Sequence, residues 1–150
     1  MTTFLDQPDD LLGLVGRCLG STDWMTISQQ QVNLFAEATG DHQWIHTDAQ
    51  RATSGPFKGT IAHGYLTLSL APMAISDVLQ IREVTAALNY GLDKVRFPAP
   101  LRVGSQVRAT VSVLSARQKT SGVEAVFSLT YEIDGEQRPA CVADVIVLYP

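Results

Sequence analysis

The chain has 150 residues, of which 45% are hydrophobic and 17% are charged, and its formal net charge is −4. This length and apolar content suit one globular domain with a sizeable core. The negative charge disfavours a nucleic-acid-binding protein, which normally presents a basic face.

The N-terminal residues 1–12 are acidic and have no basic segment ahead of an apolar stretch, so we do not expect them to act as a secretory signal. We expect a tail or a short helix docked on the surface there, followed by one or two short strands within 13–25. Cys18 and Cys141 lack metal-ligand spacing and lie in apolar runs. This predicts buried, reduced thiols in a cytoplasmic protein, with a disulfide between them left open.

A first helix is predicted from the sequence Ser28-Gln29-Gln30-Gln31, which has the form of a capping box. The helix should run to about Thr39, with Val32, Phe35 and Ala36 on its inner face. Gly40 can end it in a left-handed cap. This helix would therefore present the loop that begins at Gly40.

Asp41 and His46 in that loop are candidates for one shared site. A spacing of five separates two side chains by about 140° on a helix and places them on opposite faces of a strand. Because the next residues show no sustained period, we expect an irregular loop that curls back and brings the two together. An acid and an imidazole meeting in this way can activate a water molecule.

A second helix should begin near Ile61 or His63 and end near Gln80, with a kink at Pro72. It is apolar nearly all round, which predicts burial on all sides. Polar residues and a proline interrupt it, so we expect a core helix and no membrane span. Gly64 in its first turn lowers helix stability, which indicates close approach by a ligand or another backbone.

The remaining sequence changes to a period of two, with alternating apolar residues in 107–113 and 123–133. Strands over 86–97 and 140–148 complete a set of about four, and Ser121-Gly122 and Asp134-Gly135 supply turns. One buried helix followed by antiparallel hairpins is an α+β fold. A sheet wrapped round a single helix is the hot-dog fold, whose exposed edge strand commonly pairs with a second copy, which predicts a homodimer.

Two segments resemble the MaoC-like family of (R)-specific enoyl-CoA hydratases. The first is Phe35 followed by Gly40-Asp41-His42-Gln43-Trp44-Ile45-His46, and the second is Ile61-Ala62-His63-Gly64. The form of the first segment is similar to the branch that contains nodulation protein N. Gln43 stands where the family usually has Asn, and Trp44 where it usually has Pro. The likeness extends more weakly through Asn89-Tyr90-Gly91 and Arg96-Phe97-Pro98.

The resemblance implies the hot-dog fold and reversible hydration of a trans-2-enoyl thioester to an (R)-3-hydroxyacyl product. Asp41 and His46 would hold and activate the water, and the amide of Gly64 would meet the charge on the thioester oxygen. The acyl group would be carried by CoA or by the pantetheine of an acyl carrier protein. No metal or redox cofactor is implied.

Four further residues are candidate substrate contacts. Gln43 could orient the carboxylate of Asp41 or a water, and Tyr65 could line an acyl pocket. His63 could contact substrate or could cap and pack at the helix start. Arg96 is a candidate for CoA phosphates, as are Arg51, Lys58 and Arg102.

Three alternatives remain at this stage. Asp41 with the three histidines could bind a metal, although Gly40 and the missing apolar period argue against a helix that would align His42 and His46. A hot-dog thioesterase would need an acidic residue on the central helix, and 60–76 has none. The departures at Gln43 and Trp44 leave room for a non-catalytic acyl-binding dimer.

Overall fold

A computed structural model describes residues 1–150 of the protein. Its strands are β1 (Thr3–Leu5), β2 (Cys18–Ser21), β3 (Met25–Thr26), β4 (Leu79–Ile81), β5 (Leu88–Arg96), β6 (Gln106–Lys119), β7 (Gly122–Ile133) and β8 (Cys141–Tyr149). Its helices are η1 (Pro8–Leu14, a 3₁₀ helix), α1 (Gln29–Thr39), α2 (Trp44–Thr47), α3 (Ala49–Thr53), α4 (Gly64–Ser69) and α5 (Ala71–Val78).

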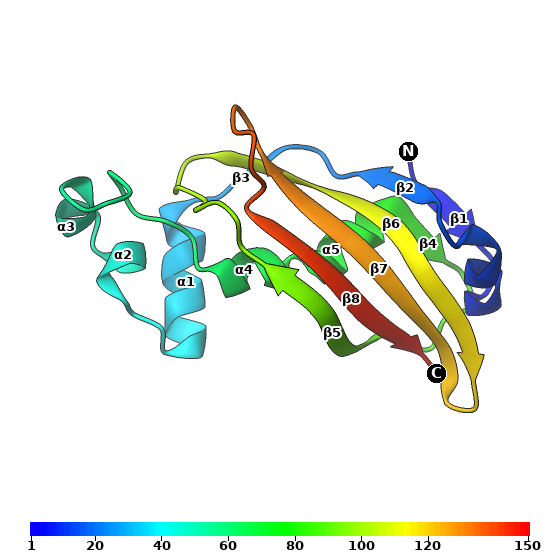
Figure 1. Ribbon diagram of the computed structural model, residues 1–150. Coiled ribbons are helices and arrows are strands. Elements are labelled where there is room, and N and C mark those ends of the chain that lie inside the picture. Colours follow the sequence, from blue (N-terminus) through cyan, green and yellow to red (C-terminus); the bar gives the residue numbers. More distant parts are fainter.

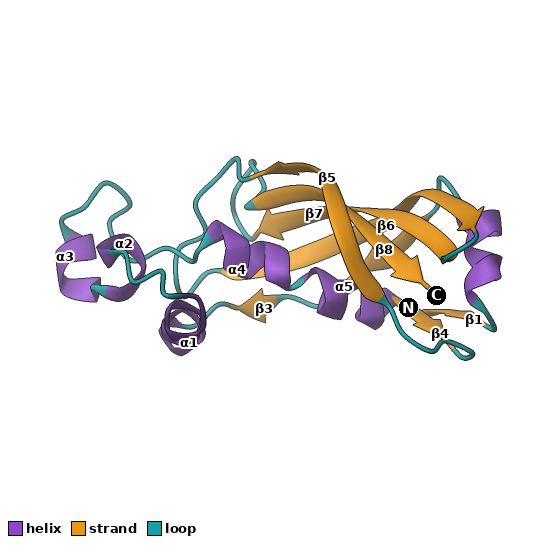
Figure 2. Ribbon diagram, turned by 90° about the horizontal axis from the view of Figure 1, so that it is seen from below, coloured by secondary structure: helices purple, strands orange, loops and turns teal.

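The main sheet is antiparallel and has six strands in the order β2-β6-β7-β8-β5, with β3 also paired to β6. Figure 1 shows this sheet curving along α4 and α5, and Figure 2 shows the two helices running along one face of it. The predicted α+β hot-dog fold is therefore confirmed. The helices α1, α2 and α3 gather at one end of the molecule, beyond the start of α4.

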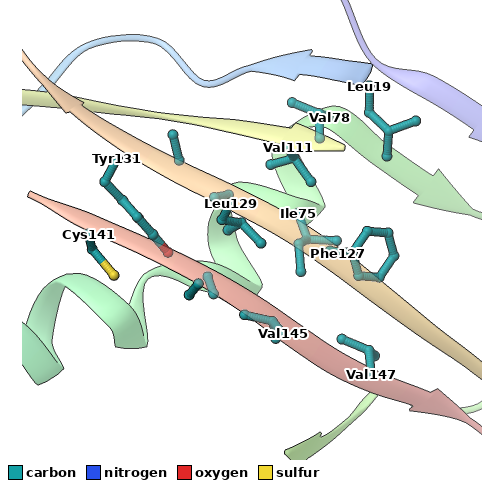
Figure 3. Close-up of a cluster of buried hydrophobic side chains, with 14 of the residues drawn as sticks. Leu19, Ile75, Val78, Val111, Phe127, Leu129, Tyr131, Cys141, Val145 and Val147 are labelled. Atoms are coloured by element: carbon teal, nitrogen blue, oxygen red, sulfur yellow. The ribbon is translucent and has the colours of Figure 1, made fainter. Parts of the chain in front are cut away.

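The core forms where the alternating strands face the central helix segment (Figure 3). Inward positions of β6 and β7, among them Val111, Phe127 and Leu129, are fully buried, and Ile75 and Val78 of α5 pack against them. The alternation places every second side chain on the inner face because strand side chains point to opposite sides in turn. The hydrophobic effect thus fixes α5 against the sheet.

The central helix is divided in two, where the sequence predicted one kinked helix. The α4 segment ends at Ser69 and α5 starts at Ala71, with Leu70 joining them. Pro72 stands in the first turn of α5, where its missing N–H costs no helical hydrogen bond. The expected burial on all sides was wrong for this chain alone, because Tyr65 and Met73 are exposed.

The N-terminal segment is part of the fold and is not a tail. The β1 strand pairs in parallel with β4, and Leu11 of η1 is fully buried in the core. The short helix that the sequence allowed is therefore present. Residue Cys18, predicted to be buried, is exposed, whereas Cys141 is buried; both are free thiols.

Candidate active site

The first helix places Asp41 by means of its two caps. The hydroxyl of Ser28 accepts from the amide of Gln31, and the side chain of Gln31 accepts from the amide of Ser28. At the other end Gly40 has a φ of 82° and its N–H donates to the carbonyl of Ala36 at 2.8 Å. This left-handed turn, which glycine adopts without steric cost, redirects the chain so that Asp41 follows directly.

Asp41 and His46 meet, as predicted, although the connection is more regular than expected. Asp41 lies in a loop, but His46 belongs to the one-turn helix α2 and is only 6% exposed. One ligand-type atom from each of Asp41, His46 and His63 lies within 4.8 Å of the other two. Asp41 lies before α2 and His46 lies within it, so the two residues do not share one regular element. The bend in the chain between Asp41 and α2 brings together side chains that a five-residue spacing on one helix or strand would hold apart.

The ring of His46 is held in one tautomer. Its Nδ1 lies 2.7 Å from the carbonyl oxygen of Ile61, and a carbonyl can only accept, so Nδ1 carries the proton when the ring is neutral. The lone pair of Nε2 is then free to act as a base. Burial lowers the pKa of His46, and the adjacent His63 lowers it further, against the raising effects of the Ile61 carbonyl and of Asp41.

His63 lies directly behind this pair, at the residue that precedes α4. It is 2% exposed, and its Nε2 donates to the backbone carbonyl of Asp41 at 2.9 Å. Its ring stacks on His46 with the centroids 3.9 Å apart and the planes inclined by 25°. The Nδ1 atom of His63 is buried and has no hydrogen-bond partner.

The stacking disfavours the metal alternative. Imidazole lone pairs lie in the ring planes, so two stacked and nearly parallel rings direct them side by side. This is a poor arrangement for convergence on one ion at the roughly 2.0–2.1 Å of a metal–nitrogen bond, although the ligand atoms of Asp41, His46 and His63 lie within 4.8 Å of one another. His42 takes no part, since it is exposed and its Nε2 is 3.8 Å from a carboxylate oxygen of Glu37.

A pocket of about 430 Å³ opens over these groups and reaches the first turn of α4. The N–H of Gly64 has no acceptor in the protein. A Cβ atom at Gly64 would lie 3.0 Å from the ring of Phe97. The lining residues are Phe35, Thr39, Asp41, His46, His63, Gly64, Tyr65 and Phe97.

A second, largely apolar pocket of about 290 Å³ is also lined by His46, Gly64 and Phe97. Phe97 therefore lies in the walls of both pockets, together with His46 and Gly64. The sequence contained Phe97 within a family-like segment but offered no reason to place it beside Gly64, because that contact depends on how β5 passes the start of α4.

The remaining predicted contacts are only partly brought to the site. Tyr65 lines the larger pocket but is 72% exposed. Gln43 contacts Asp41 through its backbone N–H, which is 3.3 Å from Oδ1, and its side chain makes no hydrogen bond. Arg96 at the end of β5 donates to its own neighbour, the carbonyl of Val95. It lines neither pocket.

Sequence reasoning missed Gln29, which supports the site from α1. Its side-chain amide donates to the carbonyl of His46 at 2.7 Å, and its oxygen accepts from the hydroxyl of Thr60 at 2.6 Å. The capping box drew attention to Ser28 and Gln31 only. Nothing in the local pattern signalled that Gln29 would tie α1 to α2.

The fold and this site together define a hot-dog enzyme with an acid–imidazole pair at the start of its central helix. The model of the MaoC like domain matches residues 12–133, and the chain belongs to that family. It is 51% identical over 150 residues to 3-hydroxyacyl-thioester dehydratase Z of Mycobacterium tuberculosis, with 99% of each chain covered. It is 44% identical over 142 residues to nodulation protein N of Rhizobium meliloti, covering 93% of this chain and 88% of the relative.

The solved structure of the (R)-hydratase from A. caviae has the same fold. Its TM-score is 0.74 at 24% sequence identity, and the alignment covers 91% of this chain and 96% of the other. The predicted family and fold are thus confirmed. No helix of the protein combines the length and hydropathy that crossing a membrane requires.

Proposed function

We propose that this protein adds water reversibly to a trans-2-enoyl thioester, with Asp41 and His46 as the groups that activate the water. The observation that carries this proposal is the free Nε2 lone pair of the buried His46, held beside Asp41 by the Ile61 carbonyl. Two relatives support the same reaction class. One is the 3-hydroxyacyl-thioester dehydratase. The other is the (R)-specific enoyl-CoA hydratase of Rhodospirillum rubrum, which is 36% identical over 88 residues.

In the proposed reaction His46 Nε2 takes a proton from the water while the oxygen bonds to C3 of the enoyl group. The carboxylate of Asp41 accepts a hydrogen bond from the second O–H of the water and orients it, and that O–H bond stays intact in the product. The π electrons of the C2–C3 bond move to the thioester oxygen and form an enolate. His46 Nε2 then gives the proton that it took to C2 on the same face, and the enolate electrons return to restore the thioester C=O bond. One water is consumed, and the enzyme returns to its starting protonation state.

The thioester oxygen gains negative charge in this step and needs a donor. We assign this role to the N–H of Gly64, which has no acceptor in the protein and stands in the wall of the pocket. A backbone donor of this kind needs no reorganisation when the charge develops. No metal or redox cofactor takes part in the proposal.

The substrate carrier is CoA or the pantetheine of an acyl carrier protein, and the (R) product follows the relatives' chemistry. We retain Arg96, together with Lys58 and Arg102, as candidates for carrier phosphates, because no carboxylate pairs with any of them. Tyr65 is a candidate acyl contact at the pocket rim. We also propose a homodimer that pairs through the exposed β5 edge.

The direct test is hydration of crotonyl-CoA by wild type, by Asp41→Asn and by His46→Asn. Each substitution should lower kcat by roughly 10²–10⁴-fold, and the double variant should be little worse than either single one, because both groups act on one water. Asn at position 46 is chosen because its amide can still donate to Ile61, so that folding is preserved.

His42→Gln is the matched control, since His42 is in the same loop and makes no contact with the pair. Near-wild-type hydration by Asp41→Asn or His46→Asn would remove that residue from the mechanism. The same assay separates the alternatives: a thioesterase would release free thiol, and a non-catalytic dimer would leave the enoyl absorbance unchanged.

A further inference from the structure

The buried His63 is the one titratable group that touches both members of the catalytic pair. The proposed reaction gives it no task. It is almost fully enclosed, and Phe35 packs against it with the ring centroids 4.9 Å apart. A histidine so enclosed and yet left with an unpartnered Nδ1 is costly, because a buried polar group without a hydrogen bond destabilises the fold.

Two contacts of His63 are separable. Its Nε2–H donates to the backbone carbonyl of Asp41, which anchors the loop that carries the carboxylate. Its ring face stacks on His46, which limits rotation of the catalytic imidazole about its own axis. The side chain of His63 thereby positions Asp41 and also fixes the plane of the imidazole ring of His46.

We propose that His63 is a positioning residue that aligns Asp41 with His46, and that it is neither a base nor a substrate-binding group. This inference rests on the proposed function. Its hydrogen bond commits Nε2 as a donor, and the remaining Nδ1 is buried behind the pair. Burial leaves little of the ring open to the pocket that would hold the acyl thioester.

The two contacts can be removed one at a time. His63→Gln places an amide N–H near the position of Nε2, so it retains the donor to Asp41 and loses the stacked ring. His63→Phe retains a ring against His46 and loses the donor. Each variant should lower kcat for crotonyl-CoA hydration by on the order of 10²-fold, the usual effect of an error of about 1 Å in the placement of reacting groups.

Substrate affinity separates positioning from substrate binding. The Kd of unreactive butyryl-CoA should stay within about twofold of wild type in both variants. A large rise in Kd with kcat unchanged would overturn the proposal in favour of a substrate contact. His42→Gln serves as the control here too, because it alters a neighbouring histidine that contacts neither catalytic side chain.

The pH profile separates positioning from simple folding support. Besides His63, the groups that face His46 are the carboxylate of Asp41 and the carbonyl of Ile61. Since His63 contributes to lowering the pKa of His46, its removal should move the acidic limb of the kcat/KM profile to higher pH in both variants.

A purely structural role predicts lower melting temperatures with unchanged kcat and pH profile for each folded molecule. That outcome would refute positioning. If wild type hydrates crotonyl-CoA but both His63 variants match it, only this inference fails. If wild type is inactive, the proposed function fails instead.

Discussion

At the scale of single residues, the environment of His46 makes this imidazole a base. Its neutral form is favoured by burial, and one hydrogen bond to Ile61 determines which nitrogen is free. Neither property belongs to histidine itself, whose unperturbed pKa lies near 6.5. The side chain acquires both from the backbone and the packing around α2.

The lowered pKa of His46 predicts how activity and stability depend on pH. Hydration should persist to lower pH than an unperturbed histidine would allow, because the lowered pKa of His46 delays its protonation. For stability the sign follows from proton uptake: as the pH falls below 6.5 the unfolded chain binds a proton at this residue before the folded chain does. The contribution of His46 to stability is therefore present above pH 6.5 and is lost as the pH falls toward the folded pKa.

This prediction is checked by thermal denaturation of wild type and His46→Asn across pH 5 to 8. Wild type should lose melting temperature more steeply below pH 6.5 than the variant does. Identical slopes would mean that His46 titrates alike in the folded and unfolded chains.

Tyr131 offers a second residue-scale prediction, in the core and away from the site (Figure 3). Its hydroxyl is buried without a partner, and burial raises its pKa strongly. Tyr131→Phe removes this unsatisfied group and keeps the ring, so the variant should be as stable as wild type or more stable, by up to about 1–3 kcal/mol. Urea denaturation measures this, and a clear loss of stability would show that the hydroxyl has a partner such as buried water.

At the scale of elements, the meeting of β5 with α4 decides how Gly64 can act. The sequence left close approach by a ligand or by another backbone as the reason for glycine at position 64, whereas the structure places the side-chain ring of Phe97 3.0 Å from where a Cβ would be. A methyl group at Gly64 would therefore press on Phe97 as well as on a bound substrate. Contact with Phe97 and contact with a bound substrate predict different results when Phe97 is also replaced.

A double-mutant cycle with Gly64→Ala and Phe97→Leu separates them. If contact with Phe97 is the reason for glycine, then Gly64→Ala should lose activity and Phe97→Leu should restore most of it. If the thioester occupies the space, kcat/KM should remain lower by on the order of 10²-fold in both backgrounds. Steady-state hydration gives the activities, and melting temperatures of all four proteins show whether any loss is one of folding.

At the scale of the whole molecule, the sheet ends in β5, an edge strand with exposed apolar side chains. Leu88, Tyr90 and Leu92 on β5 are all exposed, and so is Tyr65 beside the site. An edge strand with such residues is a ready surface for strand pairing. In our proposal the partner that pairs with the β5 edge is a second copy of this chain. This copy would cover the side of the proposed catalytic pocket that Tyr65 forms.

The dimer prediction is tested by light scattering on wild type and on Tyr90→Glu. Wild type should have twice the 16.3 kDa mass of the chain, and Tyr90→Glu should shift toward monomer because it places a charge in the proposed interface. Leu34→Glu is the matched control, since Leu34 is an exposed apolar residue on α1. A monomeric wild type would contradict the prediction.

The sequence by itself determined those features that depend on neighbours along the chain. The capping box and Gly40 predicted both ends of α1, and the period of two predicted β6 and β7. The strands predicted over 86–97 and 140–148 correspond to β5 and β8. The pairing of Asp41 with His46 was also predicted, from a loop that no regular period could describe. Such features are local because hydrogen bonding at helix ends and alternation in strands involve residues a few positions apart.

Only the tertiary structure decided which distant groups surround the site. The carbonyl of Ile61 fixes the tautomer of His46, and Gln29 holds α2 against α1. Phe97, the residue after β5, reaches Gly64. The pairing of β1 with β4, which draws the N-terminal residues into the fold, is likewise a long-range contact. These contacts join segments far apart in sequence, so their geometry follows from how the sheet wraps round the central helix, and no local pattern encodes it.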